Sequence, residues 1–286
     1  MKKIVFALML AVLAVPVLSQ VPPKPAGPPQ PAGPPKPAGP PKMQALIITG
    51  QQMGHDARAV TPELRKALEA TGLFEVRITE EFRGAGPETL EPYQLVVLNS
   101  QTRPADQRWG ERAEKALLDY VSSGKGLVMF HFAVAAFNGW EEYEKLSGCN
   151  WRPNQGHHSA AHDFVVDIRD SEHPITKGLK KALPQAKDEL YANLKCQPEG
   201  SFHVLATAYD DHALYGGKAR QPIPGPGKDE PSLWVSNYGQ GRVFATMLGH
   251  DVAAVNTPTF VTTFTRGAEW AATGKVTLPI PAELRQ

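Results

Sequence analysis

The sequence predicts an α/β fold in which a mostly parallel sheet carries helices on both faces and an antiparallel hairpin lies in the second half. Between residues 43 and 132, short apolar runs alternate with helical patterns, which is typical of a parallel sheet. Beyond residue 160 most segments are strand-like, and a turn at 238–241 separates two of them. The 286 residues suffice for one large domain of this kind.

The first strand and helix are marked by their ends. The segment MQALIITG, at 43–50, is a short apolar run closed by glycine and predicts a buried strand. Thr61 and Pro62 predict the start of a helix, as cap and first-turn residue. Gly72 predicts its end, because glycine readily adopts the left-handed conformation that closes a helix.

The next elements repeat this alternation. LFEVRIT at 73–79 and YQLVVLNS at 93–100 predict two further strands. Residues 107–122 have apolar side chains at helical spacing, and Gly124 follows them. GLVMFHF at 126–132 then predicts a fourth strand, with one histidine in an otherwise apolar run.

The second half predicts a different architecture. DFVVDIRD at 163–170 and SFHVLATAYD at 201–210 are strand-like. PSLWVSNYGQGRVFATMLG at 231–249 predicts two strands joined by a tight turn, and residues 260–271 predict a closing helix. No long linker divides residues 43–286, so they are expected to form one domain.

The N-terminus has the pattern of an export signal. Two lysines precede the apolar run 4–15, which is short for a membrane span, and the pattern predicts a signal peptide at 1–19. Residues 20–42 repeat PPKPAG-like units and predict a proline-, glycine- and alanine-rich linker. The expected location is periplasmic or extracellular, without a stable membrane anchor after cleavage. Export permits a disulfide, but the sequence does not show whether Cys149 and Cys196 meet.

Charge and motifs exclude several classes of function. The net charge is +1, which gives no electrostatic reason to expect nucleic acid as a partner. No GxGxxG or GxxxxGK[ST] motif is present, so no nucleotide cofactor is predicted. No GxSxG nucleophile motif is present either.

Polar residues recur where predicted strands end. In an open parallel sheet, ligands bind beyond the carboxyl ends of the strands. The residues at these ends are His55, Asp56, Asn99, His131 and His250. Histidine can act as a base, an acid or a metal ligand. The alternative is that each histidine is a structural residue that donates to a backbone carbonyl.

Two further segments carry candidate groups. His158 and His162 are four residues apart, a spacing that would suit one metal ion if the segment were helical. The alternative is a solvated loop. In DELYAN, Glu189 and Tyr191 would share one face of a strand and Asp188 would take the other. An exposed, charged strand end is the alternative there.

A set of short motifs in one order resembles the trehalose-utilisation ThuA-like family. The motifs are LIITG…HD, GKGLVMFHFAVAAF, EEYEKLSG, HPITKGL, DELYAN, VLATAYD, YGQGRVFATMLGHD and GAEWA, and together they span most of 43–275. The resemblance implies a flavodoxin-like sandwich of the class I glutamine amidotransferase type. In those enzymes a cysteine nucleophile follows a central strand, but no cysteine lies at or near His131, so glutamine amidotransferase activity is not expected.

The resemblance implies carbohydrate metabolism, with a small-molecule disaccharide, glycoside or 3-keto-glycoside as partner and a divalent metal such as zinc as candidate cofactor. The expected enzyme is a hydrolase, lyase or isomerase. The alternative is a non-catalytic carbohydrate-binding or scaffold protein, and a homo-oligomer is compatible with either. The expected roles are catalytic for His131, His250, Glu189 and Tyr191, substrate-binding for His55, Asp56, Asn99, Trp140 and Trp151, and metal-binding for His158 and His162.

Overall fold

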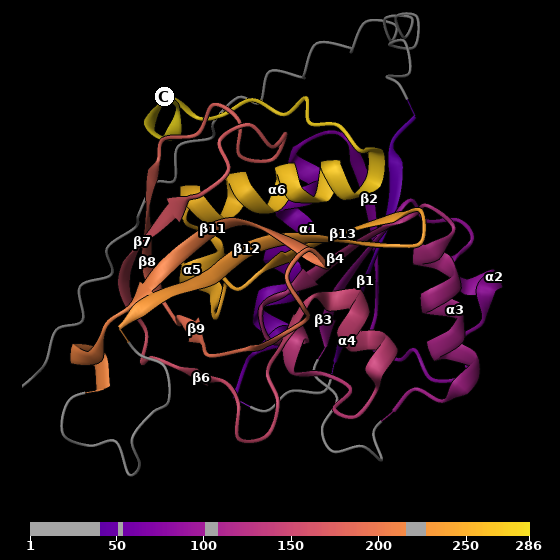
Figure 1. Cartoon of the computed structure of the whole chain (residues 1–286). Helices are drawn as coiled ribbons and strands as arrows, with labels where there is room; N and C mark the ends of the chain where they lie inside the picture. The colour runs from indigo at the N-terminus through magenta and orange to yellow at the C-terminus, as the bar shows by residue number, and fades with distance from the viewer. Residues whose placement is uncertain (1–40, 51–53, 101–107, 216–226) are drawn as a thin grey trace, which may run out of the picture. The chain divides into compact units, whose positions relative to one another are not determined.

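A nine-stranded sheet forms the centre of the computed structural model, which describes residues 41–50, 54–100, 108–215 and 227–286 (Figure 1). The strand order is β2-β1-β3-β4-β13-β12-β11-β7-β8. The expected signal peptide at 1–19 lies outside the described residues, as does all but the end of the expected linker at 20–42. Residues 41–286 cluster as one unit.

The first half of this order is parallel. Neighbouring strands pair in parallel register from β2 through β1, β3 and β4 to β13. Their bounds are Phe74–Thr79 for β2, Met43–Gly50 for β1, Leu95–Ser100 for β3, Gly126–Phe130 for β4 and Gly241–Thr246 for β13. Every side chain of β3 and β4 is buried, as expected for central strands covered on both faces.

The second half of the sheet is antiparallel. It contains β12 (Lys228–Tyr238), β11 (Phe202–Asp210), β7 (His162–Ile168) and β8 (Ala182–Asp188). Tyr238 pairs with Gly241 at the turn between β12 and β13, which confirms the predicted hairpin. The fold class expected from the sequence is therefore confirmed.

Helices cover both faces, and β13 shows how. A side chain at Gly241 would meet Val121 of α3 (Glu111–Ser122), whereas the Phe244 ring packs against Gly267 of α6 (Pro258–Thr273). Positions three apart on a strand point to opposite faces, so α3 and α6 lie on opposite sides of the sheet. The remaining helices are α1 (Ala57–Ala70), α2 (Pro87–Leu90), α4 (Glu141–Ser147) and α5 (Val252–Val255).

Helix α1 begins earlier than the sequence suggested. It starts at Ala57, and Pro62 lies inside it rather than in its first turn. The reason is Asp56, whose carboxylate accepts a hydrogen bond from Ala59 N at 3.0 Å and so satisfies a backbone donor of the first turn. Thr61 is not a cap, because its buried hydroxyl lies 2.8 Å from that of Thr49.

Strand β4 is shorter than predicted. It ends at Phe130, and His131 begins a 3₁₀ turn, His131–Ala135. His131 has a φ of 44°, which no extended strand accommodates. The predicted helix at 107–122 likewise begins only at Glu111.

Two short two-stranded sheets accompany the nine-stranded sheet. β5 (Cys149–Asn150) pairs with β10 (Lys195–Cys196), and β6 (His157–His158) pairs with β9 (Tyr191–Ala192). A disulfide joins Cys149 to Cys196, which settles the pairing that the sequence left open. None of the helices among the described residues is long and apolar enough to cross a membrane.

Candidate metal centre

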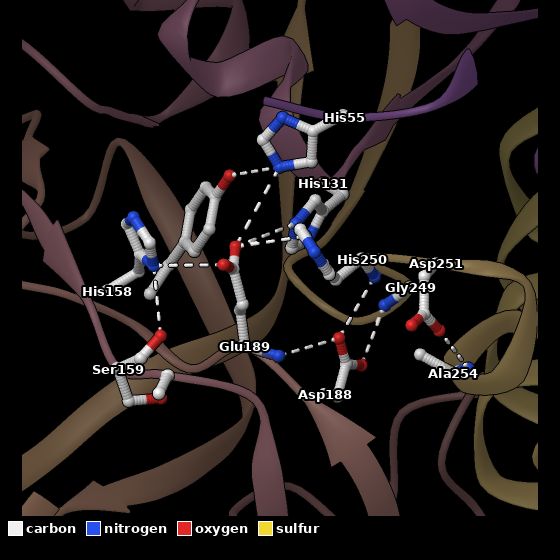
Figure 2. Close-up of polar contacts among 12 residues, drawn as sticks. His55, His131, His158, Ser159, Asp188, Glu189, Gly249, His250, Asp251 and Ala254 are labelled. Atoms are coloured by element: carbon white, nitrogen blue, oxygen red, sulfur yellow. Dashed lines mark hydrogen bonds and ion pairs between the residues drawn. The ribbon is translucent and has the colours of Figure 1, made fainter. Parts of the chain in front are cut away.

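Histidines from distant segments converge on one glutamate (Figure 2). His55 follows β1, His131 follows β4 and His250 follows β13, which are all parallel strands that end at the same edge of the sheet. Glu189 follows β8, and His158 lies on β6. Ligand sites are expected at this edge in open α/β sheets.

The two carboxylate oxygens of Glu189 have different neighbours. Oε2 lies 3.0 Å from His250 Nδ1, 3.8 Å from His131 Nε2 and 3.8 Å from His55 Nε2. Oε1 lies 3.1 Å from Nδ1 of the remaining histidine, His158. Three ring nitrogens therefore surround one oxygen, and the fourth contacts the other.

The orientation of His131 is determined by a backbone carbonyl. Its ring is fully buried, and Nδ1 lies 2.6 Å from the carbonyl oxygen of Met247. A carbonyl can only accept, so Nδ1 carries a proton and Nε2 is directed at Glu189. This backbone contact is found both in structural histidines and in histidines that are oriented to bind a metal ion, so the second nitrogen has to distinguish the two.

Two of the ring nitrogens that face Glu189 lack hydrogen bonds. His131 Nε2 and His250 Nδ1 are buried and make no hydrogen bond to any residue that the structure describes. His131 Nε2 is too far from Glu189 Oε2, at 3.8 Å, whereas His250 Nδ1 lies 3.0 Å from it without the angular alignment that a hydrogen bond needs. A lone pair facing a carboxylate is unfavourable unless a proton or a cation lies between them. A divalent cation would remove this repulsion for both rings.

The spacing of these atoms suits one ion. One ligand atom from each of His55, His131, Glu189 and His250 can be chosen so that all lie within 4.8 Å of one another. Zinc binds imidazole nitrogen at about 2.0–2.1 Å, so two ligands of one ion lie roughly 3–4 Å apart. The present spacing needs only small side-chain adjustments, and three imidazoles with one carboxylate are an ordinary ligand set for zinc and related metals.

Proton equilibria in the group are shifted by these contacts. Burial alone would raise the pKa of Glu189, but the contacts with His131, His158 and His250 outweigh it and hold that pKa well below its usual range. Contact with Glu189 raises the pKa of both His158 and His250, against the opposing effect of their burial. The negative charge of Glu189 is thus maintained at neutral pH, ready to bind a cation or protonated histidine.

Tyr191 and Trp151 border the group. The hydroxyl of Tyr191 lies 3.1 Å from His55 Nε2, and its ring centre is 4.4 Å from that of His131. The Trp151 ring lies 5.2 Å from Tyr191 and 5.6 Å from His158, centre to centre. These two residues, predicted from sequence as catalytic and substrate-binding, therefore lie beside the histidines.

The exposure of the histidines shows which side of the group is open. The side chain of His158 is 46% exposed and that of His250 is 23% exposed, whereas His131 is fully buried. A small molecule would therefore approach past His158 and His250.

Other predicted site residues lie elsewhere. His162 begins β7 rather than a helix that continues from His158, and its Nδ1 lies 3.1 Å from Ser159 Oγ, so the two histidines do not share the expected helical face. Asn99 is buried at the end of β3 and donates to Thr61 Oγ1 at 2.8 Å.

Asp56 and Trp140 also have structural partners. Asp56 caps α1, although it directly follows the ligand candidate His55. The Trp140 ring stacks on Tyr143 and contacts the edge of Phe137, with the Arg108 guanidinium 4.7 Å from its centre. Both side chains thus serve local packing or capping.

Asp188 was not among the site residues predicted from the sequence, and the structure places it beneath the site. Asp188 is fully buried and accepts hydrogen bonds from the backbone of Gly249, His250 and Glu189 (Figure 2). The one signal for it was an acidic pair at the end of a predicted strand, where a buried aspartate must find donors.

The fold and this site define a class of protein: a flavodoxin-like sandwich of the glutamine amidotransferase type in which a histidine, not a cysteine, occupies the turn after the central strand β4. A family model described as ThuA, trehalose utilisation, matches residues 44–271, and the chain belongs to this family. That membership fits a carbohydrate-related role. No curated protein matches the sequence.

Solved structures agree with this assignment. A ThuA-like protein from Parabacteroides merdae is 31% identical, with a TM-score of 0.73, and the match covers 86% of this chain and 95% of that one. A ThuA-like protein from Bacteroides uniformis is 20% identical, with a TM-score of 0.60 and coverage of 85% and 97%. A β-galactosidase from Rahnella sp. R3 shares the fold alone, at 14% identity and a TM-score of 0.51, with coverage of 84% of this chain and 33% of that enzyme.

Proposed function

We propose that this protein is an exported enzyme of carbohydrate metabolism that binds one divalent metal ion through His55, His131, Glu189 and His250. Its substrate is a disaccharide, a glycoside or, with the best chemical fit, a 3-keto-glycoside. The reaction that fits the site is removal of a proton from the carbon next to the sugar carbonyl, followed by isomerisation or elimination.

One observation carries the proposal. Three imidazole nitrogens point at Oε2 of Glu189, and two of them, on His131 and His250, are buried without a hydrogen bond to any described residue. Purely structural histidines would be satisfied on both nitrogens when buried. His131 is satisfied on one nitrogen only, and its other nitrogen is directed into the group.

The geometry suggests a division of roles that differs from the sequence-based assignment. When bound, a divalent ion supplies a Lewis acid that polarises a carbonyl oxygen. His131 and His250 then serve as ligands rather than as bases. His158 and Tyr191 lie beside the ligand group without belonging to it, so they are the groups that exchange protons with the substrate.

Glu189 contacts both the proposed metal ligands and His158, which we propose exchanges protons with the substrate. Its Oε2 faces the three ligand histidines, and its Oε1 holds the Nδ1 of His158 at 3.1 Å. The carboxylate therefore orients the half-exposed His158 ring at the open side of the site. The Trp151 ring, 5.6 Å from His158, offers an apolar face on which a sugar ring can pack.

The disulfide supports export. Structural disulfides persist in oxidising compartments and are rare in the cytosol. The bond between Cys149 and Cys196 therefore agrees with the signal peptide proposed for residues 1–19 and with a periplasmic or extracellular location. Mass spectrometry of the protein secreted by its native host tests this, because cleavage after Ser19 gives a defined mass.

The metal and the chemistry are tested together. We expect purified protein to contain close to one equivalent of a divalent metal, measured by inductively coupled plasma mass spectrometry, and to turn over 3-keto-glycosides. His131→Ala and His250→Ala should lose both properties. His162→Ala is the matched control, because it removes a nearby histidine that lies outside the ligand group.

The opposite results are equally informative. Wild-type protein that takes up no divalent ion during dialysis against zinc, cobalt or manganese would refute the metal centre. Protein that binds sugars in a thermal-shift screen but turns over no 3-keto-glycoside would instead indicate a non-catalytic carbohydrate-binding protein. Ammonia release from glutamine is not expected, since the turn after β4 carries no cysteine.

A further inference from the structure

We infer that Asp188 is a positioning residue that holds two of the proposed metal ligands, Glu189 and His250, in register with each other. The inference rests on the proposed metal centre and adds a residue that lies outside its ligand set. Asp188 ends β8, whereas His250 follows β13, and these strands are not neighbours in the sheet. The relative position of the two ligands therefore needs a direct connection.

The carboxylate of Asp188 makes that connection with both oxygens. Oδ2 accepts from Gly249 N at 2.7 Å, and Oδ1 accepts from His250 N at 2.9 Å. Oδ1 also accepts from Glu189 N at 2.9 Å. One buried side chain thus fixes the backbone of both ligand residues.

Gly249 makes this arrangement sterically accessible. Its φ of 108° turns the chain so that two successive N–H groups, its own and that of His250, reach one carboxylate. A side chain there would approach the Phe130 ring to 2.6 Å. The turn after β13 therefore packs closely against Phe130 and directs two N–H groups at Asp188.

A fourth donor, from a side chain, keeps the carboxylate in place. Gln185 Nε2 donates to Asp188 Oδ2 at 2.8 Å, and Gln185 is itself buried. Asp188 is fully buried, and its carboxyl group accepts hydrogen bonds from these four donors of the described residues. Four hydrogen bonds on one buried side chain suit a residue that must resist movement when a ligand group binds a cation.

The test compares two buried carboxylates. Asp188→Asn replaces an acceptor oxygen with an amide that faces N–H donors, and so should loosen both ligands. Glu269→Gln is the matched control, because Glu269 is also buried and accepts from the backbone of Thr277 and Leu278, but lies on α6 away from the site. Zinc affinity is measured by competition with a chromophoric chelator, and cobalt-loaded protein gives a visible spectrum that reports ligand geometry.

We expect Asp188→Asn to weaken zinc binding by about 10- to 100-fold, the usual range for loss of a partner that orients a ligand, and to change the cobalt spectrum. Glu269→Gln should stay within about threefold of wild type on the same scale and keep its spectrum. If Asp188→Asn fails to fold, Gln185→Met provides the measurement, with a smaller loss of affinity expected. Wild-type affinity and spectrum in the Asp188 and Gln185 variants would overturn the inference and leave the metal centre intact.

The positioning role of Asp188 can still be tested if the proposed metal centre proves wrong. If wild-type protein binds no metal, crystal structures of the metal-free Asp188→Asn variant and of wild type decide the matter. Displacement of His250 Nδ1 from Glu189 Oε2, which are 3.0 Å apart in wild type, would support positioning by Asp188. An unchanged distance would overturn it.

Discussion

His250 Nδ1 lies 3.0 Å from Oε2 of Glu189, although the two residues follow strands from the parallel and antiparallel halves of the sheet. The contact raises the pKa of His250 and contributes to lowering that of Glu189. It therefore links the proposed metal binding with proton binding and with the stability of this edge of the sheet.

This linkage predicts a pH dependence for the metal-free protein. His158 and His250 have raised pKa values in the folded state, so their stabilising contribution is full below the unfolded value of about 6.5 and is lost as the pH rises through the folded values. The pKa of Glu189 is lowered, so its contribution is present above about 4.3 and is lost as the pH falls toward the folded value.

The cluster should therefore stabilise the metal-free protein most between about pH 4.3 and 6.5, and less at pH 8. Urea denaturation in the presence of a chelator, followed from pH 5 to 8, measures the decline. A variant carrying His158→Gln and His250→Gln should show a smaller decline over this range. Equal slopes for the variant and wild type would assign the pH dependence to other groups.

Replacing Tyr191 by phenylalanine is expected to tighten metal binding. The hydroxyl of Tyr191 contacts His55 Nε2, the same atom that a metal would bind, so that contact must be given up when the metal enters. A hydrogen bond contributes about 0.5–1.5 kcal/mol net, which corresponds to roughly a 2- to 10-fold higher affinity for Tyr191→Phe. Isothermal titration calorimetry with zinc measures the change.

Tyr238→Phe serves as the control for this substitution, because its hydroxyl bonds to Glu142 away from the site. It should leave zinc affinity unchanged. Weaker binding by Tyr191→Phe would mean that the phenol oxygen is itself a ligand, and the proposed ligand set would have to be revised.

Reducing the disulfide should destabilise the domain substantially. Cys149 and Cys196 are 47 residues apart, so the bond closes a long loop in the unfolded chain. We expect reduction to lower the free energy of unfolding by about 2–4 kcal/mol. Urea denaturation with and without reductant measures this, and a variant with both cysteines changed to alanine should match the reduced protein. Identical midpoints in the two conditions would rule out a stabilising role for the bond.

Gly249→Ala is expected to destabilise the fold by steric overlap. A Cβ at this position would lie 2.6 Å from the Phe130 ring and 2.9 Å from that of Phe260. Such crowding costs about 1–3 kcal/mol, in addition to the strain of a positive φ. Gly200→Ala isolates that strain, because Gly200 has a φ of 90° but no described atom within 4 Å of the position that a Cβ would take. Equal losses in the two variants would show that φ alone is responsible.

Much of the fold could be predicted because its signals are local. Apolar runs such as those at 43–50 and 93–100 are long enough to identify buried strands, and the helical pattern between 107 and 122 is regular. Helix and strand ends were less predictable. The start of α1 depends on which side chain reaches a free backbone amide, and Asp56 rather than Thr61 does so.

The candidate site was only partly predictable. The sequence predicted that His55, His131 and His250 lie at one edge of the sheet, because the carboxyl ends of parallel strands meet there. The expectation that Glu189 and Tyr191 share a face of one strand was wrong, because β8 ends at Asp188 and β9 begins at Tyr191, with Glu189 in neither strand. Sequence spacing could not decide between His158 and His162, because the segment between them is not helical.

The sequence by itself determined the alternation of strands and helices, the family motifs and the set of polar residues at strand ends. Tertiary structure decided which of those residues meet: Glu189 lies at the centre of the histidines, Asp188 lies beneath them, and Cys149 bonds to Cys196. The reason is physical. Hydrophobic period and turn chemistry act over a few neighbouring residues, whereas convergence on one carboxylate depends on the order and register of strands that are far apart in the chain.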